Sequence, residues 1–195
     1  FRLAGGRPAS FVARWDGAAW LALGAGFDAP VSALAMFQGQ LHAGGHFSRA
    51  DGQPVGFVAR WNGLAWESLG SGVNDLVEAL LAVGDDLYVA GSFSTAGGVT
   101  ARNIARWDGT AWSALGEGVG AAVLALASDG TRLFVGGANN LSHGELQLGM
   151  VAQWDGQQWR RVGVTGPQGT IRALAWHRGH LYAAGDFALA DNQPA

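Results

Sequence analysis

The feature that most constrains the fold is an internal repeat of about 46 residues that runs through the whole chain. Two tryptophans keep their spacing in every copy: the first is Trp15, Trp61, Trp107 and Trp154, and the second is Trp20, Trp66, Trp112 and Trp159. An Asp-Gly or Asn-Gly dipeptide follows each first tryptophan. A fixed period of this length predicts one supersecondary unit that is stacked several times.

Each copy reads as four short strands. In the first complete copy they cover residues 31–37, 40–46, 57–61 and 65–69. Five to seven residues is strand length, and 32 glycines argue against long helices. The Asp-Gly and Asn-Gly dipeptides favour a tight hairpin between the third and fourth strands. Four antiparallel strands in each repeat are typical of a β-propeller blade, so the fold class is predicted as all-β, a β-propeller of consecutive four-stranded antiparallel blades.

The repeat also divides the chain. We expect one repeat domain over residues 1–195, with a half blade at 1–30, complete blades at 31–76, 77–122 and 123–170, and a half blade at 171–195. Three arrangements fit this content: a slice of a larger ring or a chain completed by another chain, a closed four-bladed ring in which the halves combine, and an open array. The first is favoured, and the chain is expected to be part of a longer one.

The segments "LYVAGSF" at 87–93 and "RWDGTAW" at 106–112 resemble kelch-type propeller repeats. The wider pattern "NIARWDGTAWSALGEG" is similar to repeats of secreted or surface bacterial proteins and of the fungal cortical cell-polarity marker family. The resemblance implies a propeller fold and an extracellular or cell-surface location in a bacterium. Because propellers host enzymes and binders alike, it implies no particular activity.

Composition argues against several function classes. The net charge of −3 offers no electrostatic basis for binding nucleic acid. No apolar run approaches the roughly 18 residues that membrane insertion by a helix requires. The chain has no cysteine, which excludes disulfides, and all 12 of its basic residues are arginine.

The longer loops are predicted to share one face. Alternating strand directions place the second-to-third loops, such as 47–56, beside the connections between blades, such as 70–76. The copies differ in length at two places, and both one-residue insertions fall in these loops. Because loops carry binding while a scaffold stays fixed, this face is the expected functional surface.

Candidate ligand-binding residues come from three features. The segment 139–149 departs most from the repeat and is predicted to be a loop that brings Asn139, Asn140, His143 and Glu145 to this face. The second residue of the first strand varies as Ser32, Glu78, Leu124 and Arg172, near the mouth of a central channel. His46 and Asp186 occupy equivalent repeat positions.

No cofactor or metal is expected. His177 and His180 flank a turn but have no evident third ligand, and the loop at Asp51-Gly52 lacks a calcium-binding run. The chain shows no nucleophile–base signature and no phosphate loop.

The sequence therefore favours a non-catalytic binding or structural module that presents its long loops to a glycan or a protein. Two alternatives stay open. One is a self-assembling structural protein whose half blades are completed by another chain. The other is a propeller enzyme with a site at the channel mouth, which would require the ionisable candidates to converge.

Overall fold

The computed structural model describes residues 1–163, 167–190 and 193–194, and it contains strands and turns but no helix in those residues. The complete sheets each have four antiparallel strands. The first sheet comprises β5 (Val31–Phe37), β6 (Gln40–Gly45), β9 (Val58–Trp61) and β10 (Trp66–Ser68). These bounds agree with the predicted strands to within one residue at each end.

The next two sheets repeat this order. The second sheet comprises β11 (Val77–Val83), β12 (Asp86–Gly91), β15 (Ile104–Trp107) and β16 (Trp112–Ala114). The third sheet comprises β17 (Val123–Ser128), β18 (Leu133–His143), β19 (Leu146–Trp154) and β20 (Trp159–Arg161). Small two-stranded ribbons occupy other loops: β1 (Leu3–Ala4) with β2 (Arg7–Pro8), β7 (Arg49–Ala50) with β8 (Gln53–Pro54), and β13 (Thr95–Ala96) with β14 (Val99–Thr100).

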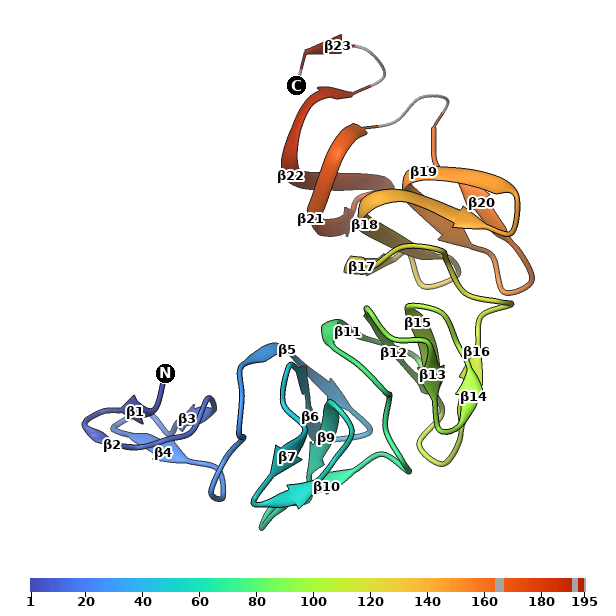
Figure 1. The fold of residues 1–195 in the computed structure, drawn as a ribbon. Coiled ribbons are helices and arrows are strands. Elements are labelled where there is room, and N and C mark those ends of the chain that lie inside the picture. Colours follow the sequence, from blue (N-terminus) through green and yellow to red (C-terminus); the bar gives the residue numbers. More distant parts are fainter. Residues whose placement is uncertain (164–166, 191–192, 195) are drawn as a thin grey trace.

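Two smaller sheets lie at the ends of the chain. The first sheet is preceded by β3 (Ala13–Trp15) and β4 (Trp20–Ala22), and the third is followed by β21 (Pro167–His177), β22 (His180–Ala190) and β23 (Gln193–Pro194). The five sheets follow one another in an open arc, with β3–β4 and β21–β23 at opposite ends (Figure 1). Contacts between β5 and β11, β11 and β17, and β17 and β21 run along the inner side of the arc.

The hairpin between the third and fourth strands is built by one side chain. Oδ1 of Asp108 accepts hydrogen bonds from the backbone N–H groups of Thr110 and Ala111, each at 2.8 Å. Gly109 between them has a φ of 100°, which glycine adopts most readily. Asp16, Asn62 and Asp155 form the same turn in the other copies.

The second tryptophan of each complete sheet joins it to the sheet before. The indole Nε1 groups of Trp66, Trp112 and Trp159 donate to the backbone carbonyls of Leu23, Leu69 and Leu115 at 3.1, 2.8 and 2.8 Å. These tryptophans lie in buried apolar clusters between adjacent sheets. A buried indole N–H requires a hydrogen-bond partner, and here a carbonyl of the preceding sheet is that partner. The second tryptophan therefore recurs wherever one sheet stacks on another.

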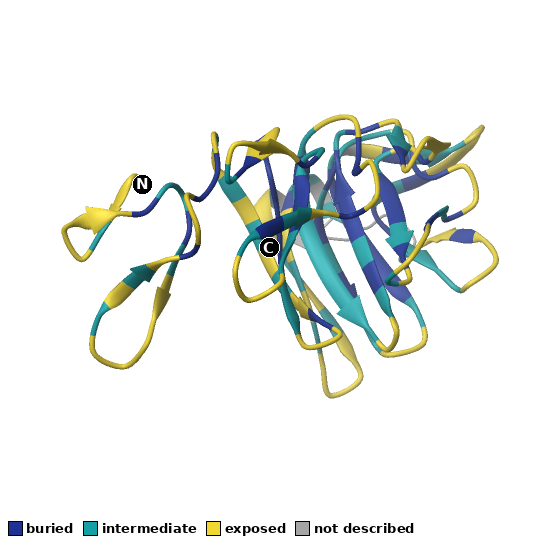
Figure 2. Ribbon diagram, turned by 90° about the horizontal axis from the view of Figure 1, so that it is seen from below, coloured by how far each residue is buried: buried dark blue, intermediate teal, exposed yellow. Residues whose placement is uncertain are grey.

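The first tryptophan pair is more exposed than its counterparts in the complete sheets. Trp15 is 51% exposed and Trp20 is 44% exposed, whereas Trp66, Trp112 and Trp159 are buried between adjacent four-stranded sheets. Figure 2 shows exposed residues concentrated on these N-terminal strands, while buried residues lie between the central sheets.

The predicted loop 139–149 is instead a hairpin. β18 and β19 continue through it, with Ser142 paired to Gln147 and His143 to Leu146. Leu141 and Leu148 are fully buried, and Gly144 takes a φ of 58° at the turn. Two leucines that enter the core on opposite strands, together with a glycine turn between them, stabilise strand pairing here.

Candidate functional site

The variable residue of each first strand lies at a β-bulge. The strand pairing shifts register there, between Val31 and Ala33, Val77 and Ala79, Val123 and Ala125, and Ile171 and Ala173. Ser32, Glu78, Leu124 and Arg172 are therefore the residues outside the regular register. A bulge redirects a side chain, and bulges are common beside functional sites. The residue that varies between repeats therefore lies where a change of side chain disturbs the regular strand pairing least.

The ionisable candidates form two separate contacts, one hydrogen bond and one ion pair. His46 Nε2 lies 3.2 Å from Glu78 Oε1, which links the first sheet to the second. Arg172 Nη2 lies 2.6 Å from Asp186 Oδ2 within the last sheet, and this contact raises the pKa of Arg172. No hydrogen bond joins the two pairs in the described part of the chain. The Arg172–Asp186 pair is largely exposed, so it contributes little stability, whereas the His46–Glu78 contact is partly buried.

The hairpin candidates have different surroundings. Asn140 and Glu145 are exposed, whereas His143 Nδ1 makes a hydrogen bond of 3.0 Å with the carbonyl of Gly118. That bond ties His143 to the connection before β17. Ser32 is exposed, and the Asn139 side chain lies outside the described residues.

The sequence prediction missed a cleft between the second and third sheets. Two adjoining cavities of about 340 and 300 Å³ share Tyr88, Trp154 and Gly156 in their walls. This volume is in the range of small-ligand pockets. The larger cavity lies toward the tight turns at Gly84, Gly130 and Gly156, whereas the expected functional surface was the long-loop face.

Tyr88 is the central residue of this cleft. It is half-buried, and burial raises the pKa of its hydroxyl, which keeps that group protonated. The hydroxyl has no hydrogen-bond partner among the residues that the structure describes. A phenol in this state combines an apolar ring with an unused polar group.

Charged side chains on both walls are already held in place. Arg106 Nε donates to Ser113 Oγ at 3.0 Å, and its Nη1 lies 3.3 Å from Asp86 Oδ2. On the opposite wall, Arg132 is paired with Asp129 at 2.7 Å and lies over the rings of Phe134 and Trp176. The cleft thus offers orientated donors and acceptors beside aromatic surface.

One sequence signal could have indicated the cleft. The residue that follows the constant leucine of each second strand is variable: it is His42, Tyr88, Phe134 and Tyr182. The role of this position depends on the residues that face it, and those residues are set by how adjacent sheets pack.

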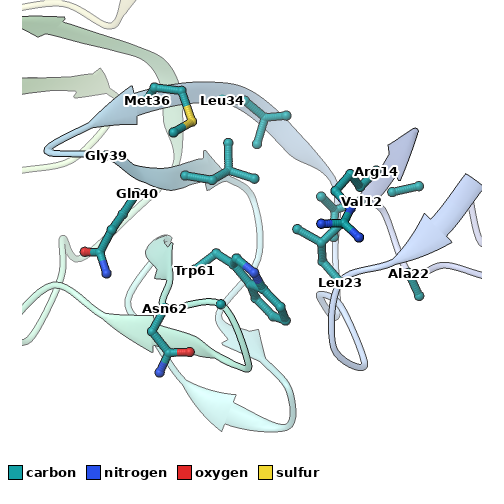
Figure 3. Close-up of a pocket in the computed structure, with 13 residues that line it drawn as sticks. Val12, Arg14, Ala22, Leu23, Leu34, Met36, Gly39, Gln40, Trp61 and Asn62 are labelled. Carbon is teal, nitrogen blue, oxygen red and sulfur yellow. The ribbon is translucent and has the colours of Figure 1, made fainter. Parts of the chain in front are cut away.

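A second hollow lies at the N-terminal end of the arc. A cavity of about 540 Å³ separates β3–β4 from the first sheet, and Leu34, Met36 and Trp61 point into it opposite Val12 and Arg14 (Figure 3). Leu34 is 53% exposed and Met36 is 60% exposed. Both belong to the face that packs against a preceding sheet elsewhere in the chain.

Neither a metal-ligand cluster nor a membrane-spanning helix occurs in the described residues. No group of three or more His, Asp or Glu side chains there is arranged to hold a metal ion. In the same residues, no helix has the length and apolar character needed to cross a membrane.

Comparison with known proteins bears on the fold alone. No protein-family model matches the chain, and no curated protein matches it. The crystal structure of the computationally designed Ika4 protein is similar, with a TM-score of 0.57 and 18% identity over 83% of this chain and 88% of that chain. The computationally designed Ika8 protein gives a TM-score of 0.52 and 18% identity over 81% of this chain and 43% of that chain.

Proposed function

We propose that this chain is a non-catalytic binding module built as an arc of kelch-like β-propeller blades. Sheets that stack along a shared inner side support the propeller assignment. A glycan is the ligand class that the geometry supports best, and the predicted setting is a secreted or cell-surface bacterial protein.

The observation that carries this proposal is the cleft at Tyr88. A sugar ring has an apolar face that packs on an aromatic ring and a rim of hydroxyls that donate and accept hydrogen bonds. Tyr88 and Trp154 supply the aromatic surface, and Asp86 and Arg106 supply an acceptor and a donor. Because Asp86 and Arg106 pair with each other, this acceptor and donor favour a polar, uncharged ligand.

The test is a titration of the chain with a panel of neutral oligosaccharides, followed by two-dimensional NMR and calorimetry. We expect resonance shifts centred on Tyr88 and on the Trp154 indole. Replacement of Tyr88 by alanine is expected to weaken binding at least tenfold, about 1.4 kcal/mol. Val83→Phe is a second variant that keeps Tyr88 and reduces the space in the cleft, and it is also expected to weaken binding.

The matched control is Tyr182→Ala. Tyr182 occupies the same repeat position as Tyr88 but is 55% exposed on the last sheet. Equal loss in both tyrosine variants would contradict the cleft as the site. Shifts that centre instead on the β18–β19 hairpin would place the ligand on the long-loop face, and an absence of shifts with every sugar would remove the glycan proposal.

A further inference from the structure

The two ends of the arc carry complementary open strand edges. In the first sheet β6 pairs with β9, with Leu41 opposite Trp61 and Ala43 opposite Ala59. The second and third sheets have the same register between their second and third strands. β22 is a second strand and β3 is a third strand, yet within the described residues neither has this partner.

The repeat fixes how these edges would meet. Residues equivalent to Ala43 and Ala59 are Ala183 on β22 and Ala13 on β3. Pairing in the common register would therefore set Ala183 opposite Ala13, and Leu181 opposite Trp15. The resulting sheet would have the strand order of the complete ones: β21, β22, β3, β4.

The exposed side chains at the two ends are complementary as well. At the junction between the first and second sheets, Ala35 and Phe37 pack with Leu80 and Ala82 of the next sheet. Leu34 and Met36, which line the N-terminal cavity, are the equivalents of Leu80 and Ala82. The equivalents of Ala35 and Phe37 on the last sheet are Ala175 and His177, both exposed.

We propose that two copies of this chain complete each other, with β3 of one copy pairing with β22 of the other and β21 of the second copy closing the cavity beside Leu34 and Met36. The ends of a single copy lie apart in the arc (Figure 1). Buried clusters at all three junctions from β3–β4 to the third sheet resist the rotations that would bring those ends together. An open edge is a template for another chain, and such a head-to-tail contact closes as a ring or continues as a fibre.

The test uses disulfide trapping, because the chain has no cysteine of its own. Ala13→Cys and Ala183→Cys are made as separate variants, mixed in equal amounts and oxidised slowly. Neither variant can form a disulfide within one chain. We expect a disulfide-linked pair with twice the chain mass of 20.2 kDa.

The controls test the register and rule out random oxidation. Each variant is oxidised alone, and Ala13→Cys is also mixed with Ala175→Cys, whose cysteine lies on β21 away from the open edge. All three controls are expected to give at most one tenth of the product. Met36→Glu in the Ala13→Cys chain places a charge in the cavity and is expected to abolish the product, while the circular dichroism spectrum confirms that the variant is folded.

Two outcomes would overturn the proposal. If the double variant Ala13→Cys/Ala183→Cys forms its disulfide within one chain and the mixture forms none, the ends meet in one copy. If neither sample forms the disulfide and the chain has a native mass of 20.2 kDa at all concentrations, the edges do not pair. The glycan titration does not depend on this result, so the two proposals fail separately.

Discussion

The junction between the first and second sheets is filled beside Phe37, whereas the junction between the second and third sheets is open beside Tyr88, although the same repeat builds both and each has a buried cluster. In the filled junction Phe37 is buried, and its ring lies 5.5 Å from the imidazole of His42, itself 2% exposed. In the open junction the equivalent residues are Val83 and Tyr88, and a cavity of about 340 Å³ remains beside them. Losing an aromatic ring at one position opens a cleft without changing the strand pairing, so the scaffold tolerates a binding site in this place.

The largest expected effect comes from removing the ring that fills the closed junction. Phe37→Ala should destabilise the chain by about 3–5 kcal/mol, because it removes a buried aromatic and leaves a cavity. Val83→Ala at the equivalent position of the open junction should cost less than about 1.5 kcal/mol, since Val83 is half-buried. Urea unfolding of both variants measures the difference, and equal losses would show that the two junctions are packed alike.

His42 should make the filled junction sensitive to moderate acid. Burial lowers the pKa of His42 from 6.5, and the nearby Arg60 lowers it further. Between pH 6.5 and the lowered pKa of His42 in the folded chain, the unfolded chain binds more protons than the folded chain does. The stability that neutral His42 contributes is therefore complete above pH 6.5 and is lost as the pH falls below it. Tyr88 at the equivalent position does not titrate in this range.

The variant His42→Tyr tests this difference. Between pH 7 and pH 5, the thermal unfolding midpoint of this variant should fall less than that of the natural chain. His180→Tyr, which alters an exposed histidine, should keep the decline. If His42→Tyr declines as steeply as the natural chain, another group causes the acid sensitivity.

The smallest expected effect concerns the tight turns of the two sheets. The backbone N–H of Ala111 and the hydroxyl and N–H of Thr110 lower the pKa of Asp108 to about 2. A lowered carboxyl pKa gives stability that is present above pH 3.8 and is lost as the pH falls from 3.8 toward 2. Asn62 forms the same turn in the first sheet with a group that does not titrate.

The variant Asp108→Asn should therefore flatten the stability profile between pH 4 and pH 2. The effect should be small because Asp108 is fully exposed. Asp16→Asn, in the end sheet, should have a similar small effect, because the backbone N–H groups of Ala19 and Ala18 also lower the pKa of Asp16. A steeper acid decline in Asp108→Asn than in the natural chain would contradict the assigned role.

Much of the candidate site could not be predicted from the sequence, although two side-chain contacts join predicted residues. His46 with Glu78, and Arg172 with Asp186, were candidates, but the sequence does not say which partner each one meets. Tyr88 was not singled out, because an isolated tyrosine in a strand gives no sign of the space beside it. That space depends on Val83, on the other strand of the same hairpin, and on Trp154 in the next sheet.

The sequence by itself determined the strands and turns, because these follow from local chemistry. Alternating short apolar segments, Asp-Gly or Asn-Gly dipeptides and the repeated tryptophans specify hairpins and their order, and the bounds of β5 match the prediction at both ends. The tertiary structure decided what the repeats become when stacked. Burial of Leu141 and Leu148 turned a predicted loop into a hairpin, and Trp15 and Trp20 are exposed although Trp66, Trp112 and Trp159, the counterparts of Trp20, are buried. A strand needs only its own residues and a turn, whereas burial depends on neighbours that are distant in the sequence, and that is the physical reason for the division.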